Sequence, residues 1–178
     1  MRGFDGDIRS FAAEEIRKTG VDLRFNTNIS SLIPIGDGYE ATLSDGSTLV
    51  VDTVLCATGR HPNIEDLGLE HTKVTLDSRG YVEADARFQT KEPSIFALGD
   101  MTGGPQLTPV AIAQAMAFAH THFGNDSKVM DYEFIPTAVF CQPNIGTVGL
   151  TEEAARDLGL ELQIFKSDFR PMKHTLSG

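Results

Sequence analysis

An aspartate at the end of an apolar run is the first feature of this sequence that could do chemistry. The pattern of residues 94–98 (SIFAL) predicts a short buried strand, and Gly99 and Asp100 follow it directly. Ligands of α/β proteins bind at the carboxyl ends of strands, and a glycine there lets the backbone approach a ligand closely. The Asp100 carboxylate could therefore accept hydrogen bonds from the hydroxyl groups of a sugar or a ribityl chain.

A predicted helix opens a few residues later, at Leu107, Thr108 and Pro109. The free N–H groups and the positive dipole end of a helix favour negative charge, and a reduced flavin carries such charge at its N1/O2 edge. Taken alone, Gly99 and Asp100 favour a plain strand-to-helix turn in which the aspartate only caps a loop. Taken together, residues 94–113 favour a contact with a flavin.

Two longer helices are predicted from apolar residues spaced three and four apart. The first covers residues 7–19, and the second, clearer one covers residues 108–123. Thr108 is expected to be the N-cap of the second helix, Pro109 its first residue, and Gly124 its end. Because this helix is apolar almost all round, we expect it to be buried.

Strands are predicted from alternating patterns and from short apolar runs, and two Asp-Gly or Gly-Asp-Gly turns indicate an antiparallel meander. Thr151 is expected to cap a further short helix, and residues 61–69 and 124–131 are expected to be linkers. The order of the elements predicts an α/β chain. The predicted strands are residues 21–25, 30–35, 39–43, 48–51, 53–57, 94–98, 137–140 and 161–165, with a further turn and strand at residues 74–82.

Charge and composition exclude several classes of protein. The formal net charge of −10 argues against nucleic acid as a main partner, since phosphate binding needs a cationic surface. The two cysteines form no CxxC pair, which favours a reducing compartment, and we expect a cytoplasmic protein. No apolar run approaches the ~20 residues that span a bilayer, and the first residues lack the apolar segment of a secretory signal.

Other residues that could do chemistry are weaker candidates. Cys56 is expected to end a buried strand, where a free cysteine usually behaves as a small hydrophobe, and Cys141 follows another strand. His120 and His122 do not share a helix face and would make a poor metal pair. Residues 36–38 (GDG) connect strands and open no helix, so they are not a phosphate-binding loop. No metal site is predicted.

Five stretches carry a resemblance to a known family: LCATGRHPN, SIFALGD, QLTPVAIA, IPTAVFCQPNIGTVGLTEEAA and FRPM. In order and spacing they resemble the class I pyridine nucleotide-disulfide oxidoreductases, most closely the bacterial glutathione reductase branch. The resemblance covers nearly the whole chain and implies an α/β fragment of a three-domain flavoprotein reductase. It assigns residues 1–62 to the end of an NADPH-binding domain with its β-meander. Residues 63–133 would be the C-terminal segment of an FAD-binding domain, and residues 134–178 the first half of an α+β dimerisation domain.

The resemblance implies two cofactors, FAD and NADPH. For the flavin, it places Gly99 and Asp100 at the ribityl chain, and Leu107 and Thr108 at the pyrimidine edge of the isoalloxazine.

For NADPH, the resemblance implies a second set of residues. Gly59 and Arg60 would lie near the nicotinamide entry, and the backbone of Ala138 would face the nicotinamide amide. Arg2 matches an arginine that binds the 2′-phosphate, a role that suits a permanently charged, bidentate donor.

Several parts of such an enzyme have no counterpart in this sequence. There is no GxGxxG before a helix, no CxxxxC dithiol and no candidate for the acid–base histidine. We therefore predict no catalytic residue in this chain and expect the chain alone to be inactive and to retain FAD weakly or not at all. Met116 stands where well-known glutathione reductases have an arginine that holds the peptide disulfide.

The parent protein is expected to be a homodimer that reduces glutathione disulfide or a similar small disulfide. A reductase of another low-molecular-weight disulfide and a dihydrolipoamide-dehydrogenase-like enzyme stay open. So does a truncated, non-catalytic chain that only binds a nucleotide or a partner.

Overall fold

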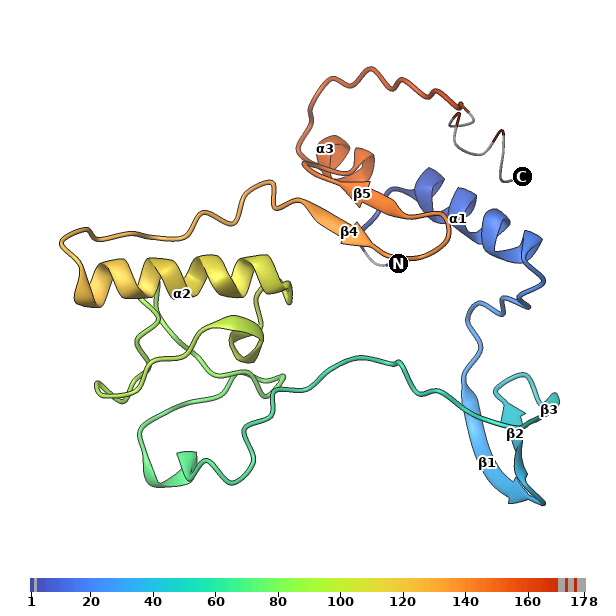
Figure 1. Cartoon of the computed structure of the whole chain (residues 1–178), viewed down its shortest axis with the longest axis horizontal. Coiled ribbons are helices and arrows are strands. Elements are labelled where there is room, and N and C mark those ends of the chain that lie inside the picture. Colours follow the sequence, from blue (N-terminus) through green and yellow to red (C-terminus); the bar gives the residue numbers. More distant parts are fainter. Residues whose placement is uncertain (2, 170–171, 173–174, 176–178) are drawn as a thin grey trace. The chain divides into compact units, whose positions relative to one another are not determined.

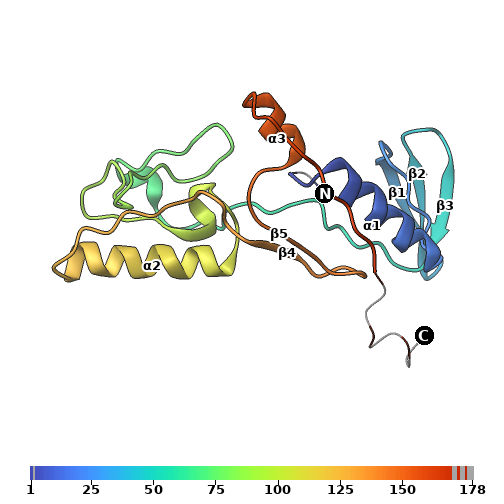
Figure 2. The ribbon, with the colours of Figure 1, turned by 90° about the horizontal axis from the view of Figure 1, so that it is seen from above.

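The computed structural model describes residues 1, 3–169, 172 and 175. It divides the chain into two compact units, one of residues 28–132 and one that joins residues 1–27 to residues 133–178. Figures 1 and 2 show the elements of both units from two directions. In the described residues no helix is both long and apolar enough to cross a membrane.

The unit of residues 28–132 begins with an antiparallel three-stranded sheet (Figure 1). Ala41 and Leu43 on the middle strand are buried, and Asp45 closes the second turn by accepting a hydrogen bond from the Ser47 N–H at 2.9 Å. The predicted meander is confirmed. Its strands are β1 (Ile29–Ile35), β2 (Gly38–Leu43) and β3 (Thr48–Val51).

Turns and isolated bridges make up most of the next part of this unit. Leu76 bridges Val82, and Gln89 bridges Phe96. Two single-turn 3₁₀ helices occur, η1 (Leu69–His71) and η2 (Gly99–Thr102). The buried strand predicted at residues 94–98 is wrong, because this segment makes one bridge and no ladder. The predicted burial of this segment is confirmed at Ala97, which is 2% exposed.

The second long helix, α2 (Thr108–Phe123), has the predicted bounds and contacts η2 (Figure 1). Its N-cap is Leu107, not Thr108, so Thr108 and Pro109 are the first two helical residues. Gly124 ends the helix as predicted.

The expectation that α2 is buried all round is wrong. Val110, Gln114 and Ala117 are buried, whereas Ile112 and Met116 are more than half exposed. An apolar helix is buried only on the faces against which other elements pack. In α2 only one stripe of residues is covered in this way.

The other unit forms helices α1 and α3 and one hairpin in its described residues. Helix α1 is Gly6–Lys18, strands β4 (Thr137–Val139) and β5 (Ile145–Thr147) pair antiparallel, and helix α3 is Glu152–Asp157. Strand β5 had not been predicted, although its β-branched residues lie between turn-forming residues.

Contacts between the two ends of the chain hold this unit together. The Asp5 carboxylate accepts a hydrogen bond from the Glu152 N–H at 2.6 Å, and Arg9 pairs with Glu153 at 3.1 Å. The Thr151 hydroxyl accepts from the Ala154 N–H at 3.1 Å, which confirms Thr151 as the cap of α3.

Three further predicted strands, at residues 21–25, 53–57 and 161–165, are absent from the described structure. Leu55 is 88% exposed and Cys56 is exposed, so the predicted burial of this cysteine is also wrong. The reason is common to all three: an extended segment becomes a strand only when a neighbour takes up its backbone hydrogen bonds.

Candidate functional site

The Gly99 peptide is held at both of its polar groups. Gly99 adopts φ +75°, a left-handed conformation that glycine reaches without a Cβ penalty. Its N–H donates to the Gln114 Oε1 at 2.6 Å, and its carbonyl accepts from the Thr102 hydroxyl at 2.9 Å. The Asp100 side chain leaves this turn 47% exposed, which keeps the carboxylate accessible to a ligand.

Arg60 approaches the same carboxylate. Its Nη1 lies 3.9 Å from the Asp100 Oδ2, and the preceding Gly59 adopts φ +143°. The structure thus brings together two sites that the sequence had presented separately, the ATGR segment and the Gly-Asp turn.

The loop between this turn and α2 is held by Tyr81. Gly103 packs so closely on the tyrosine ring that a Cβ at this position would lie 2.9 Å from the ring. Gln106 donates to the Tyr81 hydroxyl at 3.2 Å, and the Val82 N–H donates to the Met101 carbonyl at 2.9 Å.

The short turn of residues 77–81 holds Tyr81 in place. The Asp77 carboxylate accepts from the backbone N–H groups of Tyr81 and Arg79. These hydrogen bonds favour the ionised carboxylate and so lower the pKa of Asp77 below its ordinary value of 3.8. The hydrogen bond from the Tyr81 N–H has the largest effect. The Arg79 guanidinium also lies over the Tyr81 ring, 5.1 Å from its centre.

The start of α2 provides the second half of the candidate flavin contact. The Leu107 carbonyl accepts from the N–H groups of Val110 and Ala111, at 3.0 and 3.1 Å, and Thr108 is exposed at the first helical position. The Thr108 N–H precedes the first intrahelical hydrogen bond, so it belongs to the positive end of the helix. An exposed carboxylate is thus followed by an exposed helix start, which offers acceptors and donors of the kind predicted here to contact a flavin.

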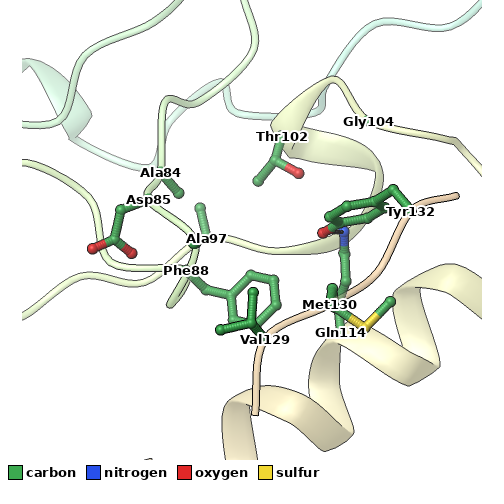
Figure 3. Close-up of a pocket in the computed structure, with 11 residues that line it drawn as sticks. Ala84, Asp85, Phe88, Ala97, Thr102, Gly104, Gln114, Val129, Met130 and Tyr132 are labelled. Atoms are coloured by element: carbon green, nitrogen blue, oxygen red, sulfur yellow. Dashed lines mark hydrogen bonds between the residues drawn. The ribbon is translucent and has the colours of Figure 1, made fainter. Parts of the chain in front are cut away.

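Sequence reasoning missed a cavity of about 450 Å³ behind the turn. Figure 3 shows Gln114 reaching from α2 toward Tyr132 along one side of it. Asp100, Leu107 and Thr108 do not line this cavity. Its walls include Phe88, Ala97, Thr102, Gln114, Met130 and Tyr132. The sequence feature that could have indicated this cavity is Gln114, the one polar residue in the apolar stretch 109–119.

Two candidate NADPH residues remain, Ala138 and Arg2. Ala138 is an exposed residue of β4 in the other unit, opposite Gly146, and Arg2 lies outside the described residues. Within the unit of residues 28–132, the structure places Arg60 beside Asp100.

The cysteines and histidines form no site in the described part of the chain. Cys141 Sγ lies 3.0 Å from the Pro143 carbonyl oxygen, and His122 Nε2 lies 2.9 Å from the Arg87 carbonyl oxygen. No group of three metal-ligating side chains occurs among the described residues.

Two family models match this sequence. The model for "Pyridine nucleotide-disulphide oxidoreductase" matches residues 1–115, and the model for the dimerisation domain of the same family matches residues 135–178.

Curated relatives match over all of the chain. A glutathione reductase of Burkholderia cepacia is 41% identical over 178 residues, which are 40% of its length. The chloroplastic/mitochondrial glutathione reductase of Pisum sativum is 42% identical and is covered to 32%, and the trypanothione reductase of Trypanosoma congolense is 37% identical and covered to 36%. The chain thus spans about 40% or less of the length of these relatives.

Solved structures of similar fold include a flavoprotein disulfide reductase. The HOCl-induced flavoprotein disulfide reductase RclA of Escherichia coli superposes with a TM-score of 0.85 at 30% identity, covering 92% of this chain and 38% of RclA. LpdA of Mycobacterium tuberculosis superposes with a TM-score of 0.77 at 30% identity, covering 87% of this chain and 34% of LpdA.

Proposed function

The chain belongs to the pyridine nucleotide-disulphide oxidoreductase family, and on this premise we propose that it is part of an FAD- and NADPH-dependent disulfide reductase of the glutathione reductase type. The observation that carries the proposal is the Gly99 turn, which presents an accessible Asp100 carboxylate beside Arg60 and leads into the exposed start of α2. When bound, FAD would accept a hydride from NADPH and pass electrons to a disulfide.

In this proposal the residues of the turn bind and orient the flavin. Asp100 accepts hydrogen bonds from the ribityl hydroxyls. Gly99 has no side chain, so the ribityl chain can lie close to its backbone. Leu107 and Thr108 face the pyrimidine edge, where the helix end favours the negative charge of the reduced flavin.

The NADPH residues are proposed on the family resemblance and on the place of Arg60 next to the flavin residues. Gly59 and Arg60 would line the nicotinamide approach, the Ala138 backbone would bind the nicotinamide amide, and Arg2 would bind the 2′-phosphate. None of these residues takes a catalytic proton or attacks a disulfide, so the dithiol and the acid–base group must come from other residues of the enzyme.

The proposed substrate is glutathione disulfide or another small disulfide, and the proposed assembly is a cytoplasmic homodimer. The matched dimerisation domain over residues 135–178 supports the dimer. We keep the boundaries at residues 62 and 133 as proposed domain limits. The exposed Met116 leaves glutathione without the arginine expected there, which keeps a different small disulfide as the second candidate.

The test is NADPH oxidation by the FAD-loaded enzyme that carries these residues. Glutathione disulfide, trypanothione disulfide and lipoamide are compared at equal concentrations, and the proposal predicts the highest kcat/KM with glutathione disulfide. A preference for lipoamide would support the dihydrolipoamide-dehydrogenase-like alternative, and no turnover with any disulfide would overturn the proposal.

A further inference from the structure

Gln114 is the one polar residue in the stretch 109–119 of helix α2, and it is almost fully buried. Its exposure is 3%, and Thr90 is the other buried polar residue of the described chain. A buried amide is unfavourable unless its donor and acceptor are both bonded. The hydrogen-bond partners of the Gln114 amide therefore indicate its role.

The two ends of the Gln114 amide have different partners. Its Oε1 accepts from the Gly99 N–H at 2.6 Å, and its Nε2 donates to the Tyr132 hydroxyl at 2.8 Å. The Gly99 N–H is a donor only, so it fixes which end of the amide faces the turn. Tyr132 then holds the other end, and Figure 3 shows the two side chains in contact.

Gly99 is the residue whose conformation sets the direction of Asp100. It adopts φ +75°, and no side chain of its own restrains it. The bond from Gln114 replaces that missing restraint, and it does so from the middle of a helix, which is a rigid support.

We propose that Gln114 is a positioning residue for the flavin site: it fixes the Gly99 turn and so aims the Asp100 carboxylate at the ribityl chain, with Tyr132 orienting the glutamine. This inference rests on the proposed function for its ligand, whereas the restraint on the turn is a property of the chain itself. The two parts can be tested separately.

The restraint is tested by hydrogen exchange of the Gly99 amide in the 178-residue chain. Gln114→Met keeps the length and packing of the side chain but removes the acceptor, and we expect exchange to rise about fivefold or more. Gln114→Glu keeps an acceptor for the Gly99 N–H and should restore the protection. Ile112→Ala, on the exposed part of the same helix, is the matched control and should change nothing.

Two outcomes would overturn the restraint. One is unchanged exchange at Gly99 in a folded Gln114→Met variant, and the other is loss of protection in Gln114→Glu as large as in Gln114→Met. If Gln114→Met does not fold, Tyr132→Phe replaces it. It removes only the far hydrogen bond and should raise Gly99 exchange about twofold, and no change would overturn the role of Tyr132.

The role toward the flavin is tested by a double-mutant cycle on the dissociation constant of FAD in the FAD-loaded enzyme. Gln114→Met should weaken FAD about tenfold in the native background and less than about twofold in an Asp100→Ala background, because it acts through that carboxylate. Equal losses in both backgrounds would show a general structural role and overturn the positioning. If the native enzyme retains no FAD, the proposed function fails, and the exchange experiment still decides the restraint on Gly99.

Discussion

The Nη1 atom of Arg60 lies 3.9 Å from the Oδ2 atom of Asp100, although the two residues are far apart in the sequence. Their side chains are 67% and 47% exposed, and exposed pairs of this kind contribute about 0–1 kcal/mol to stability. The importance of this pair is therefore its position. It places a guanidinium beside the carboxylate that we propose for the flavin.

Arg60 and Arg79 offer a direct comparison of two equally exposed arginines. Arg79 is 66% exposed, makes two hydrogen bonds to the Asp77 Oδ2 at 3.2 and 3.1 Å, and lies over the Tyr81 ring. We expect Arg79→Ala to lower the melting temperature by about 2–4 °C and Arg60→Ala to lower it by less than half as much. Thermal unfolding followed by circular dichroism checks this. An equal or larger effect of Arg60→Ala would show that its pair with Asp100 is a main structural contact.

The turn at Asp77 should make stability depend on pH in the acid range. Hydrogen bonds from the Tyr81 and Arg79 backbone hold the pKa of Asp77 below its ordinary value of 3.8 in the folded chain. A group with a lowered folded pKa stabilises above its unfolded pKa, and this stabilisation is lost as the pH falls through the folded value. The native chain should thus lose more stability from about pH 5 downwards than Asp77→Asn does.

The comparison with Asp77→Asn is needed because the pKa of Glu83 is also lowered, so Glu83 also makes stability fall at acid pH. The Thr75 hydroxyl and Lys91 lower the pKa of Glu83 in both proteins, whereas the Asp77 charge, which opposes this shift as the last of its causes, is absent from Asp77→Asn. Urea unfolding at several pH values measures the difference. Parallel curves for the native chain and Asp77→Asn would contradict the assigned role of the turn.

Some elements could be predicted from the sequence because their determinants are local. The bounds of α2 followed from an apolar run between Pro109 and Gly124, and the meander followed from turns at Gly36 and Asp45. Asp100 could be selected because glycine, aspartate and a helix start occur in fixed order.

Other features depend on partners that a local pattern does not name. The runs at residues 53–57 and 94–98 have strand-like composition, but in the described structure neither is paired as a strand. The pair between Arg60 and Asp100 and the contact between Gln114 and Gly99 join distant segments. The shift of the N-cap from Thr108 to Leu107 reflects the usual imprecision of one residue at helix ends.

Helix α3 depends on its cap. Its six residues are too few for independent stability, and the Thr151 hydroxyl bonds the Ala154 N–H at 3.1 Å. We expect Thr151→Ala to reduce the free energy of unfolding by about 1 kcal/mol, whereas Thr151→Ser, which keeps the hydroxyl, should stay close to the native value. Chemical denaturation measures both. Equal losses in the two variants would indicate that the methyl group matters and the cap does not.

The 178-residue chain by itself should lack disulfide reductase activity. Its two cysteines, Cys56 and Cys141, form no CxxxxC dithiol, and it has no GxGxxG for the FAD pyrophosphate. We expect no NADPH oxidation with glutathione disulfide, and FAD well below one equivalent in the purified chain. NADPH oxidation at the rate of a complete reductase, or a yellow protein with stoichiometric flavin, would refute this.

The central claim is that Asp100 binds the ribityl chain of the flavin, and the most direct test is the dissociation constant of FAD for the FAD-loaded enzyme that carries these residues. Loss of the carboxylate in Asp100→Ala should weaken FAD about tenfold or more, because a charge-assisted hydrogen bond contributes about 1.5–3 kcal/mol. Asp126→Asn, an exposed aspartate in the segment after α2, is the control and should bind as the native enzyme does. An Asp100→Ala variant that binds FAD as tightly as its Asp126→Asn control would contradict the account.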